Sequence, residues 1–327
     1  MEEMSRLRAP VVTAGRVGVL ERLRHNLAIQ DYACVLFHSY LFLRAAVSPP
    51  SHEANVARGF TLALLTMTVV TVGLVRGGAL GSSRVRAGVY RLGLFGPMAL
   101  SYFSLKFLLP GLHVPLRDGP LLAIDRALLG ETPAVWLEHF NRPAVIEWFS
   151  FFYYSYFTIL ALMTLSSLAF GRGGRTMREL FVGALTVVGV GTIGYTIVPA
   201  VGPHISIAFA GPLHGGFWWD QVRTAVEDAG AAMDVFPSLH TAYPTFFVLH
   251  AFGHRKEGPM RWAWPILALF CVNIIISTML LRWHYAIDVV AGLALAAGAR
   301  WVAVWVSRRE AGRGVDDDRQ LTWPAWR

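Results

Sequence analysis

Two motifs decide how this chain folds: FPSLHT at residues 236–241 and STMLLRWHYAID at residues 277–288. Two apolar segments lie between them, joined by the polar turn GHRKEG at residues 253–258. If both segments span a membrane, the chain crosses the bilayer and returns. His240 and His284 then meet at the same face. The sequence therefore predicts an active site assembled at one membrane surface.

The composition indicates a polytopic membrane protein. Of the 327 residues, 54% are hydrophobic and only 15% are charged, whereas a soluble domain carries about 25% charged residues. The net charge of +8 does not indicate a nucleic-acid partner, because the basic residues lie between apolar segments rather than on one face. We therefore expect the membrane bilayer to surround this chain. Cys34 and Cys271 both lie inside apolar segments, where we expect buried free thiols.

The order of apolar and polar segments predicts an all-α, polytopic membrane bundle with about eight transmembrane helices. A transmembrane helix needs about 20 apolar residues. Eight stretches approach this length: residues 28–47, 60–75, 89–110, 148–170, 180–198, 237–252, 263–281 and 285–306. We assign residues 28–306 to a single transmembrane catalytic domain. Residues 1–27 form a basic arm, and the charged residues 307–327 form a tail that we expect to be disordered.

Basic residues in the loops predict the orientation. With the N-terminus inside, the inner segments hold most of the Lys and Arg: five Arg in residues 1–27, four in 76–91, three in 171–179, and Arg255, Lys256 and Arg261. The outer segments hold fewer, and Arg223 is the only Lys or Arg in residues 199–236. Short basic loops resist translocation. We therefore expect both termini in the cytoplasm and the two motifs at the extracytoplasmic face.

Three further segments lie near the predicted site. Residues 119–140 combine charges with apolar residues at near-helical spacing, which predicts a short amphipathic helix on the surface; the same segment suits a lid, and the sequence does not decide between them. Residues 199–236 form a Gly- and Pro-rich loop, in which the aromatic residues 217–219 suit a membrane interface. The aromatic residues of 148–170 favour helix packing and lipid contact over a substrate-lining wall.

The two motifs resemble those of the type-2 phosphatidic acid phosphatase superfamily. PSLH at residues 237–240 resembles its second motif, and H-x-x-x-D at residues 284–288 resembles the end of its third motif. The longer run STMLLRWHYAIDVVAG at residues 277–292 resembles the inositol phosphorylceramide synthase branch. The resemblance implies a six-helix catalytic core within the bundle.

The resemblance is incomplete at the phosphate-binding residues. Thr278 stands where phosphatase members usually carry Arg, and residues 135–143 end in Arg-Pro but lack the Lys of the first motif. We expect Ser238 at a helix start, Arg282 in the C-terminal motif, and Lys106 to contact the phosphate. Arg282 and Lys106 can instead extend along the membrane surface to reach water.

The resemblance implies a catalytic set of His240, His284 and Asp288. His284 and Asp288 are four residues apart, so both face one side of a helix. The carboxylate can then hold the proton of one ring nitrogen while the other nitrogen attacks phosphorus. The family implies a phosphohistidine at His284 and protonation of the leaving oxygen by His240. Without Cys/His ligand spacing or a Gly-rich phosphate loop, we expect no metal and no cofactor.

These features predict an integral-membrane enzyme acting on a lipid phosphate ester. A phosphotransferase passes the phosphorylated group to a lipid alcohol, whereas a phosphatase passes it to water. The STM context at residues 277–279 favours the transferase, and an inositol-phosphate head group and a sphingolipid acceptor follow only by analogy. A transporter would scatter polar residues along the middle of its spans, whereas here they gather at one face.

Overall fold

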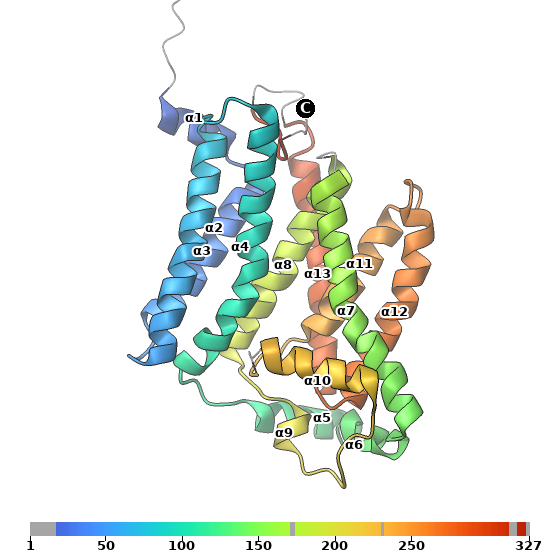
Figure 1. Ribbon diagram of the computed structural model, residues 1–327. Helices are drawn as coiled ribbons and strands as arrows, with labels where there is room; N and C mark the ends of the chain where they lie inside the picture. Colours follow the sequence, from blue (N-terminus) through green and yellow to red (C-terminus); the bar gives the residue numbers. More distant parts are fainter. Residues whose placement is uncertain (1–17, 171–173, 230–231, 314–318, 325–327) are drawn as a thin grey trace, which may run out of the picture.

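The computed structural model describes residues 18–170, 174–229, 232–313 and 319–324. These residues form a bundle of long helices, and no β-strand occurs among them (Figure 1). The helices are α1 (Val19–Asn26), α2 (Ile29–Ala46), α3 (His52–Arg76), α4 (Ser83–Gly111), α5 (Asp118–Leu129), α6 (Pro133–Trp136), the 3-10 helix η1 (Leu137–Phe140), α7 (Pro143–Phe170), α8 (Arg175–Ile197), α9 (Pro203–Ser206), α10 (Phe217–Ala229), α11 (Leu239–Gly253), α12 (Met260–Leu280) and α13 (Ala286–Arg309). The all-α bundle predicted from the sequence is confirmed.

Within the described residues, six helices are long and apolar enough to cross a membrane: α3, α4, α7, α8, α12 and α13. Two of the eight predicted spans do not reach this standard. α2 has 18 residues, and its Asp31, His38 and Arg44 lower its hydropathy. α11 has 15 residues, fewer than the roughly 20 that a span requires. Six of the eight predicted spans thus meet this standard of length and composition, as expected of a multi-pass membrane protein.

The short helix α11 lies inside the bundle. It contacts α7, α8, α12 and α13, and its buried residues include Phe246 and Phe247. Because neighbouring helices cover α11, the thickness of the bilayer does not set its length. His240, in the first turn of α11, is therefore held among the helices rather than in the lipid.

The bundle has two distinct ends. In Figure 1, α1 and the C-terminal residues lie at the upper end, while α5, α6, α9 and α10 lie across the lower end. The helix predicted within residues 119–140 is present as α5. The loop predicted over residues 199–236 contains α10, because Trp219, Val222 and Val226 recur at helical spacing and are turned inward.

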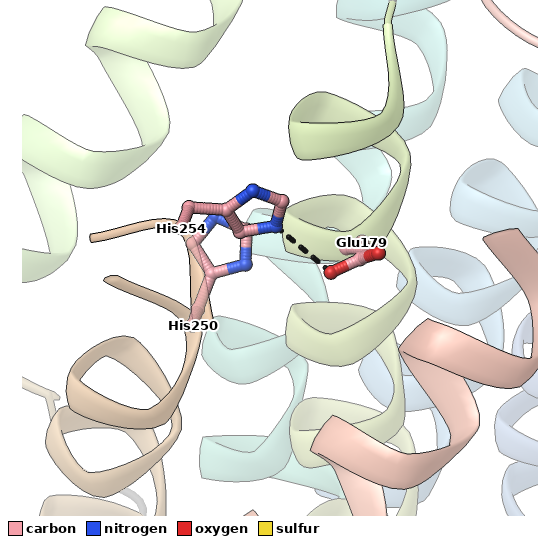
Figure 2. Close-up of side chains that lie close together, drawn as sticks. All are labelled: Glu179, His250 and His254. Atoms are coloured by element: carbon pink, nitrogen blue, oxygen red, sulfur yellow. Dashed lines mark hydrogen bonds and ion pairs between the residues drawn. The ribbon is translucent and has the colours of Figure 1, made fainter. Parts of the chain in front are cut away.

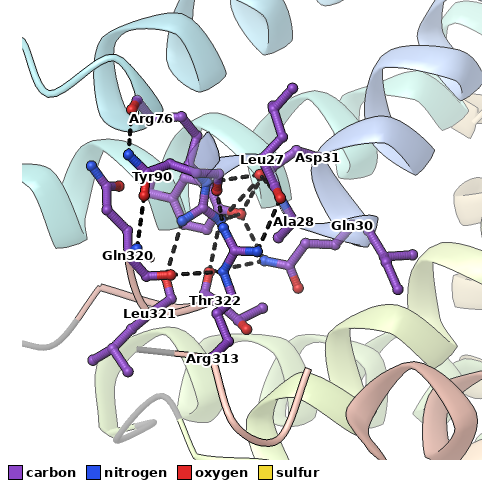
Figure 3. A network of polar contacts seen from close by, with 12 residues as sticks. Leu27, Ala28, Gln30, Asp31, Arg76, Tyr90, Arg313, Gln320, Leu321 and Thr322 are labelled. Atoms are coloured by element: carbon purple, nitrogen blue, oxygen red, sulfur yellow. Dashed lines mark hydrogen bonds and ion pairs between the residues drawn. The ribbon is translucent and has the colours of Figure 1, made fainter. Parts of the chain in front are cut away.

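The charged tail is partly built into the bundle (Figure 3). Asp31 of α2 and Arg76 of α3 form a buried ion pair at 2.7 Å. Arg76 also donates to the backbone oxygen of Thr322 at 2.9 Å, and the neighbouring Trp323 is only 1% exposed. For the described part of the tail this corrects the expectation of disorder, because its backbone and its Trp are bound between helices. The first 17 residues of the predicted basic arm lie outside the described residues.

Candidate active site

A cavity of about 460 Å³ lies at the lower end of the bundle. Residues of α4, α7, α10 and α11 and of the loops before α9, α11 and α13 surround it. Its polar lining consists of Tyr102, Tyr153, His204, Arg223, Glu227, Asp234, His240, Arg282, Trp219, Trp283 and His284. Two of the three predicted catalytic residues, His240 and His284, thus line one cavity, and Asp288 lies directly behind His284.

His284 and Asp288 form a buried pair at the N-terminus of α13. Nδ1 of His284 lies 3.4 Å from Oδ2 of Asp288, and the two residues are 4% and 0% exposed. The same Oδ2 accepts the backbone N–H of Tyr285 at 2.8 Å, so the carboxylate also satisfies an unpaired donor at the helix start. When the His284 proton is on Nδ1 and faces this carboxylate, Nε2 is the nitrogen with the lone pair for attack.

His240 faces His284 across the cavity. Its ring stacks on Tyr153 with 4.4 Å between centroids and lies 4.2 Å from the ring of Tyr156. The rings of His240 and His284 are 6.1 Å apart, a separation at which both can contact one phosphoryl group. Nε2 of His240 is buried and has no hydrogen-bond partner among the described residues, which fits a group whose partner is a substrate.

Ser238 joins α11 to α13. Its Oγ accepts the N–H of Thr241 at 3.2 Å and so caps α11, and its N–H donates to the backbone oxygen of Asp288 at 3.1 Å. The helices approach this closely because residue 292 is Gly, where a Cβ would lie 2.6 Å from the Ser238 oxygen. Ser238 is buried beside the predicted catalytic residues, where it links the start of α11 to the first turn of α13.

Of the two cations predicted to bind phosphate, the structure brings Arg282 to the cavity and leaves Lys106 exposed on α4, outside the cavity lining. Arg282 donates to the backbone oxygen of Gly211 at 2.8 Å and to the carboxylate of Glu138 at 3.1 Å. Its guanidinium lies 3.8 Å from the ring centre of Phe209. Burial lowers the pKa of Arg282, and the charge of Glu138 opposes this shift.

Two carboxylates of α5 hold the loop that follows α12. Asp125 accepts the backbone N–H groups of Ala286 at 2.8 Å and Ile287 at 3.0 Å, which are unpaired donors at the first turn of α13. Asp118 accepts the hydroxyl of Tyr285 at 2.9 Å. The segment that the sequence predicts as a surface helix or a lid therefore braces the loop that carries His284.

Helix α10 covers the cavity. Its residues Trp219 and Arg223 are part of the lining. Glu147, near the start of α7, accepts the backbone N–H groups of Gly216, Trp218 and Trp219 at 2.7–3.0 Å. These bonds satisfy donors at the N-terminus of α10, so the helix is anchored at the end where its Trp residues lie.

The sequence interpretation missed Asp234, Tyr102 and Arg223. Tyr102 donates to Oδ2 of Asp234 at 2.7 Å, and burial raises the pKa of Asp234. The position of Asp234 just before the PSLH motif is a signal that could have identified it. Tyr102 is 132 residues away from Asp234 in the chain and offers no such signal. Tyr153, in the aromatic stretch for which packing was favoured, lines the cavity as well.

Comparison with curated proteins and with solved structures gave no match. A family model described as the PAP2 superfamily matches residues 119–302. The matched range is more than half of the chain. It contains α5 apart from its first residue, Asp118, together with α10 and all three predicted catalytic residues. It does not single out the inositol phosphorylceramide synthase branch. The motifs, the geometry around them and this match agree, and the chain belongs to the PAP2 superfamily.

Proposed function

We propose that this chain is an integral-membrane lipid phosphotransferase that works through a phosphohistidine at His284. The observation that carries the proposal is the convergence of His240 and the His284–Asp288 pair on one cavity. Membership of the superfamily supports lipid phosphate esters as the substrate class. Within that class, an inositol-phosphate donor rests on the resemblance of residues 277–292 to the synthase branch.

The proposed reaction has two half-reactions. In the first, Nε2 of His284 attacks phosphorus, the bond to the leaving oxygen breaks, and His240 donates a proton to that oxygen. Asp288 keeps the other His284 proton on Nδ1 and stabilises the positive charge that the ring gains. In the second, an acceptor hydroxyl attacks phosphorus, His240 takes its proton, and Nε2 of His284 leaves. Both histidines then regain their starting states.

Arg282 and Arg223 are the cations that we propose for the phosphate oxygens, because both line the cavity. A guanidinium pairs well with phosphate through charge-assisted hydrogen bonds. Arg282 contacts Glu138 at 3.1 Å. A bound phosphate can replace Glu138 as the partner of Arg282. Ser238 contributes by fixing the start of α11. A phosphate contact of Lys106 stays a prediction without support from the cavity lining.

The cover of the cavity supports transfer over hydrolysis. A transferase must keep water away from the phosphoenzyme until a lipid hydroxyl arrives. Apolar and aromatic residues of α10 and of the neighbouring loops, including Trp219, Val226 and Leu213, lie over the cavity. We propose that they exclude water and contact the lipid acceptor.

Transfer is expected to exceed hydrolysis in purified protein. Lipid product and free phosphate are measured in one reaction while a lipid alcohol is titrated from none to excess, and transfer should dominate at high acceptor. Trp219→Ala opens the cover and should increase the share of free phosphate. Trp262→Ala, at a residue of α12 that is 70% exposed, is the matched control and should keep the wild-type ratio.

The opposite result would identify a phosphatase. Phosphate release that is fast without acceptor, and that no acceptor changes, contradicts the transferase proposal. It leaves the phosphohistidine mechanism intact, since both activities share the first half-reaction.

We further propose that both termini are cytoplasmic and that the cavity opens at the extracytoplasmic face, as the loop charges predict. Ala79→Cys, between α3 and α4, and Ala208→Cys, after α9, place exposed thiols at the two ends of the bundle. In a background without Cys34 and Cys271, an impermeant reagent should label Ala208→Cys in intact cells and Ala79→Cys only after lysis. The reverse pattern would place the cavity in the cytoplasm.

A further inference from the structure

A second cluster of titratable side chains lies at the other end of α11 from the cavity. Glu179 near the start of α8, His250 in the last turn of α11 and His254 at its C-cap come together there (Figure 2). Their potential ligand atoms all lie within 4.8 Å of one another. The three residues are 0%, 0% and 1% exposed. None of them takes part in the proposed reaction.

The spacing of the two histidines brings them to one side of α11. His250 and His254 are one helical turn apart, so their rings lie on the same face, and the ring centroids are 4.8 Å apart. This H-x-x-x-H spacing is a signal that the sequence interpretation, which expected no metal ligands, missed. Glu179 is 75 residues before His254, and only the fold brings it to the pair.

The contacts of His254 suit a bound cation. Its Nε2 lies 2.9 Å from Oε2 of Glu179, and its Nδ1 lies 3.0 Å from Oε2 of Glu257. A neutral imidazole has one N–H and can donate to only one of these carboxylates. If Glu257 accepts the Nδ1 proton, the lone pair of Nε2 points at the carboxylate oxygen of Glu179. A cation bound to both of these atoms would make their close approach favourable. A carboxylate behind the second ring nitrogen is the usual environment of a metal-bound histidine.

His250 is the second observation that points to a ligand. Both of its ring nitrogens are buried and have no hydrogen-bond partner among the described residues. A buried polar group without a partner is unfavourable. Figure 2 shows the rings of His250 and His254 on the same side of Glu179, so a bond to a shared ion would satisfy one nitrogen of His250.

The donor atoms of the cluster favour one class of metal ion. Arg175 contacts its Oε1 at 2.7 Å, and Arg300 contacts its Oε2. These arginines hold the carboxylate in place. Glu179 is the only carboxylate of the three clustered residues, whereas Ca²⁺ and Mg²⁺ are held mainly by several oxygen ligands. Two imidazole nitrogens and one carboxylate oxygen are instead a donor set that Zn²⁺ uses, with water in the fourth position.

We propose that Glu179, His250 and His254 bind a zinc-class divalent transition-metal ion that joins α8 to α11. Ligands of one tetrahedral Zn²⁺ lie roughly 3.4 Å apart when the bonds are about 2.1 Å. On binding, Nε2 of His254 therefore moves slightly away from Glu179, which it contacts at 2.9 Å, while ligand atoms that are farther apart, up to 4.8 Å, move together. The ion lies far from the phosphate chemistry and does not enter the proposed reaction. Its effect is to clamp the end of α11 that carries no catalytic residue.

Direct binding tests this site. The full chain in detergent, freed of any histidine tag and stripped with EDTA, is titrated with Co²⁺ and with Zn²⁺. We expect one equivalent of Co²⁺ with the visible absorption of a tetrahedral site, and a Tm that rises with Zn²⁺. His250→Phe removes one ligand and should weaken binding by roughly 100-fold or more. His52→Phe, at an exposed histidine near the other end of the bundle, should bind like the wild type.

Two results would overturn the site. One is wild-type protein that binds no more Co²⁺ or Zn²⁺ than His250→Phe. The other, useful if His250→Phe does not fold, is Glu257→Gln protein with wild-type affinity, because loss of the carboxylate behind Nδ1 should weaken binding by roughly tenfold. Both readouts are binding measurements, so they are independent of the proposed phosphotransferase activity.

Discussion

His284→Ala is expected to abolish turnover of every lipid phosphate substrate and to abolish the phosphoenzyme. The substitution removes the nitrogen that attacks phosphorus, and no other described side chain faces Asp288 in the same way. Loss of a nucleophile that works with a paired acid–base group costs roughly 10⁶-fold in rate, by analogy with hydrolase triads. The ring of His284 is buried beside the cavity, so the loss of stability from Ala is a separate effect that a Tm measurement reports.

The phosphoenzyme provides the direct measurement. Rapid quenching with a phosphorus-labelled donor should trap an acid-labile, base-stable label on wild-type protein and none on His284→Ala. His240→Ala should still form the label from a donor with a good leaving group, because such a group needs no proton. His52→Ala, at an exposed histidine, is the control for loss of an imidazole. Turnover by folded His284→Ala protein would end the phosphohistidine proposal.

Asp288→Asn is expected to lower kcat by roughly 10³–10⁴-fold, by analogy with the carboxylate of the serine-protease triad. An Asn side chain can accept the Tyr285 N–H through its oxygen, as Oδ2 of Asp288 does at 2.8 Å. The same Oδ2 lies 3.4 Å from Nδ1 of His284, so the Asn oxygen faces both groups, but the side chain no longer carries the negative charge that stabilises the imidazolium formed in the attack. The rate therefore falls while the helix start is preserved.

Comparison with Asp288→Ala separates the two roles of this carboxylate. Asp288→Asn should retain the wild-type Tm within a few degrees, whereas Asp288→Ala loses the helix-start contact as well, a loss of about 1 kcal/mol for a typical cap. Both should lose activity to a similar degree. Asp288→Asn activity within tenfold of wild type would contradict the orienting role proposed for Asp288.

Most of the long helices could be predicted because each contains its own run of apolar residues. Runs of apolar residues predicted most of the long helices. The turn at residues 253–258 predicted the antiparallel pair of α11 and α12, which brings His240 toward His284. Hydropathy along the chain does not show that α11 is enclosed by α7, α8, α12 and α13, and this enclosure allows α11 to have only 15 residues. The described tail was expected to be disordered because its burial depends on Asp31 and Arg76, which lie on distant helices.

His240, His284 and Asp288, the predicted catalytic residues, could be placed near one another because the two motifs fix them locally, although His284 lies two residues before α13 and not on the same helix as Asp288. The rest of the cavity could not. Arg223 reaches the lining only because α10 forms and is capped by Glu147, and the Tyr102–Asp234 contact joins residues 132 positions apart. The predicted phosphate contact of Lys106 stays a prediction: its register along α4 is compatible with such a contact, but its side chain is exposed and is not part of the cavity lining.

The bracing of the catalytic loop by α5 has a consequence for the order in which the protein is made. Asp125 accepts donors from residues 161 and 162 positions later in the chain. During synthesis, α5 therefore reaches the membrane surface long before the N–H groups of Ala286 and Ile287 exist, and Asp125 lacks these two partners until α13 has been made. The loop with His284 gains its final shape only at that moment. A nascent chain thus lacks the loop geometry that the proposed phosphohistidine reaction needs, and it gains this geometry only when α13 is in place.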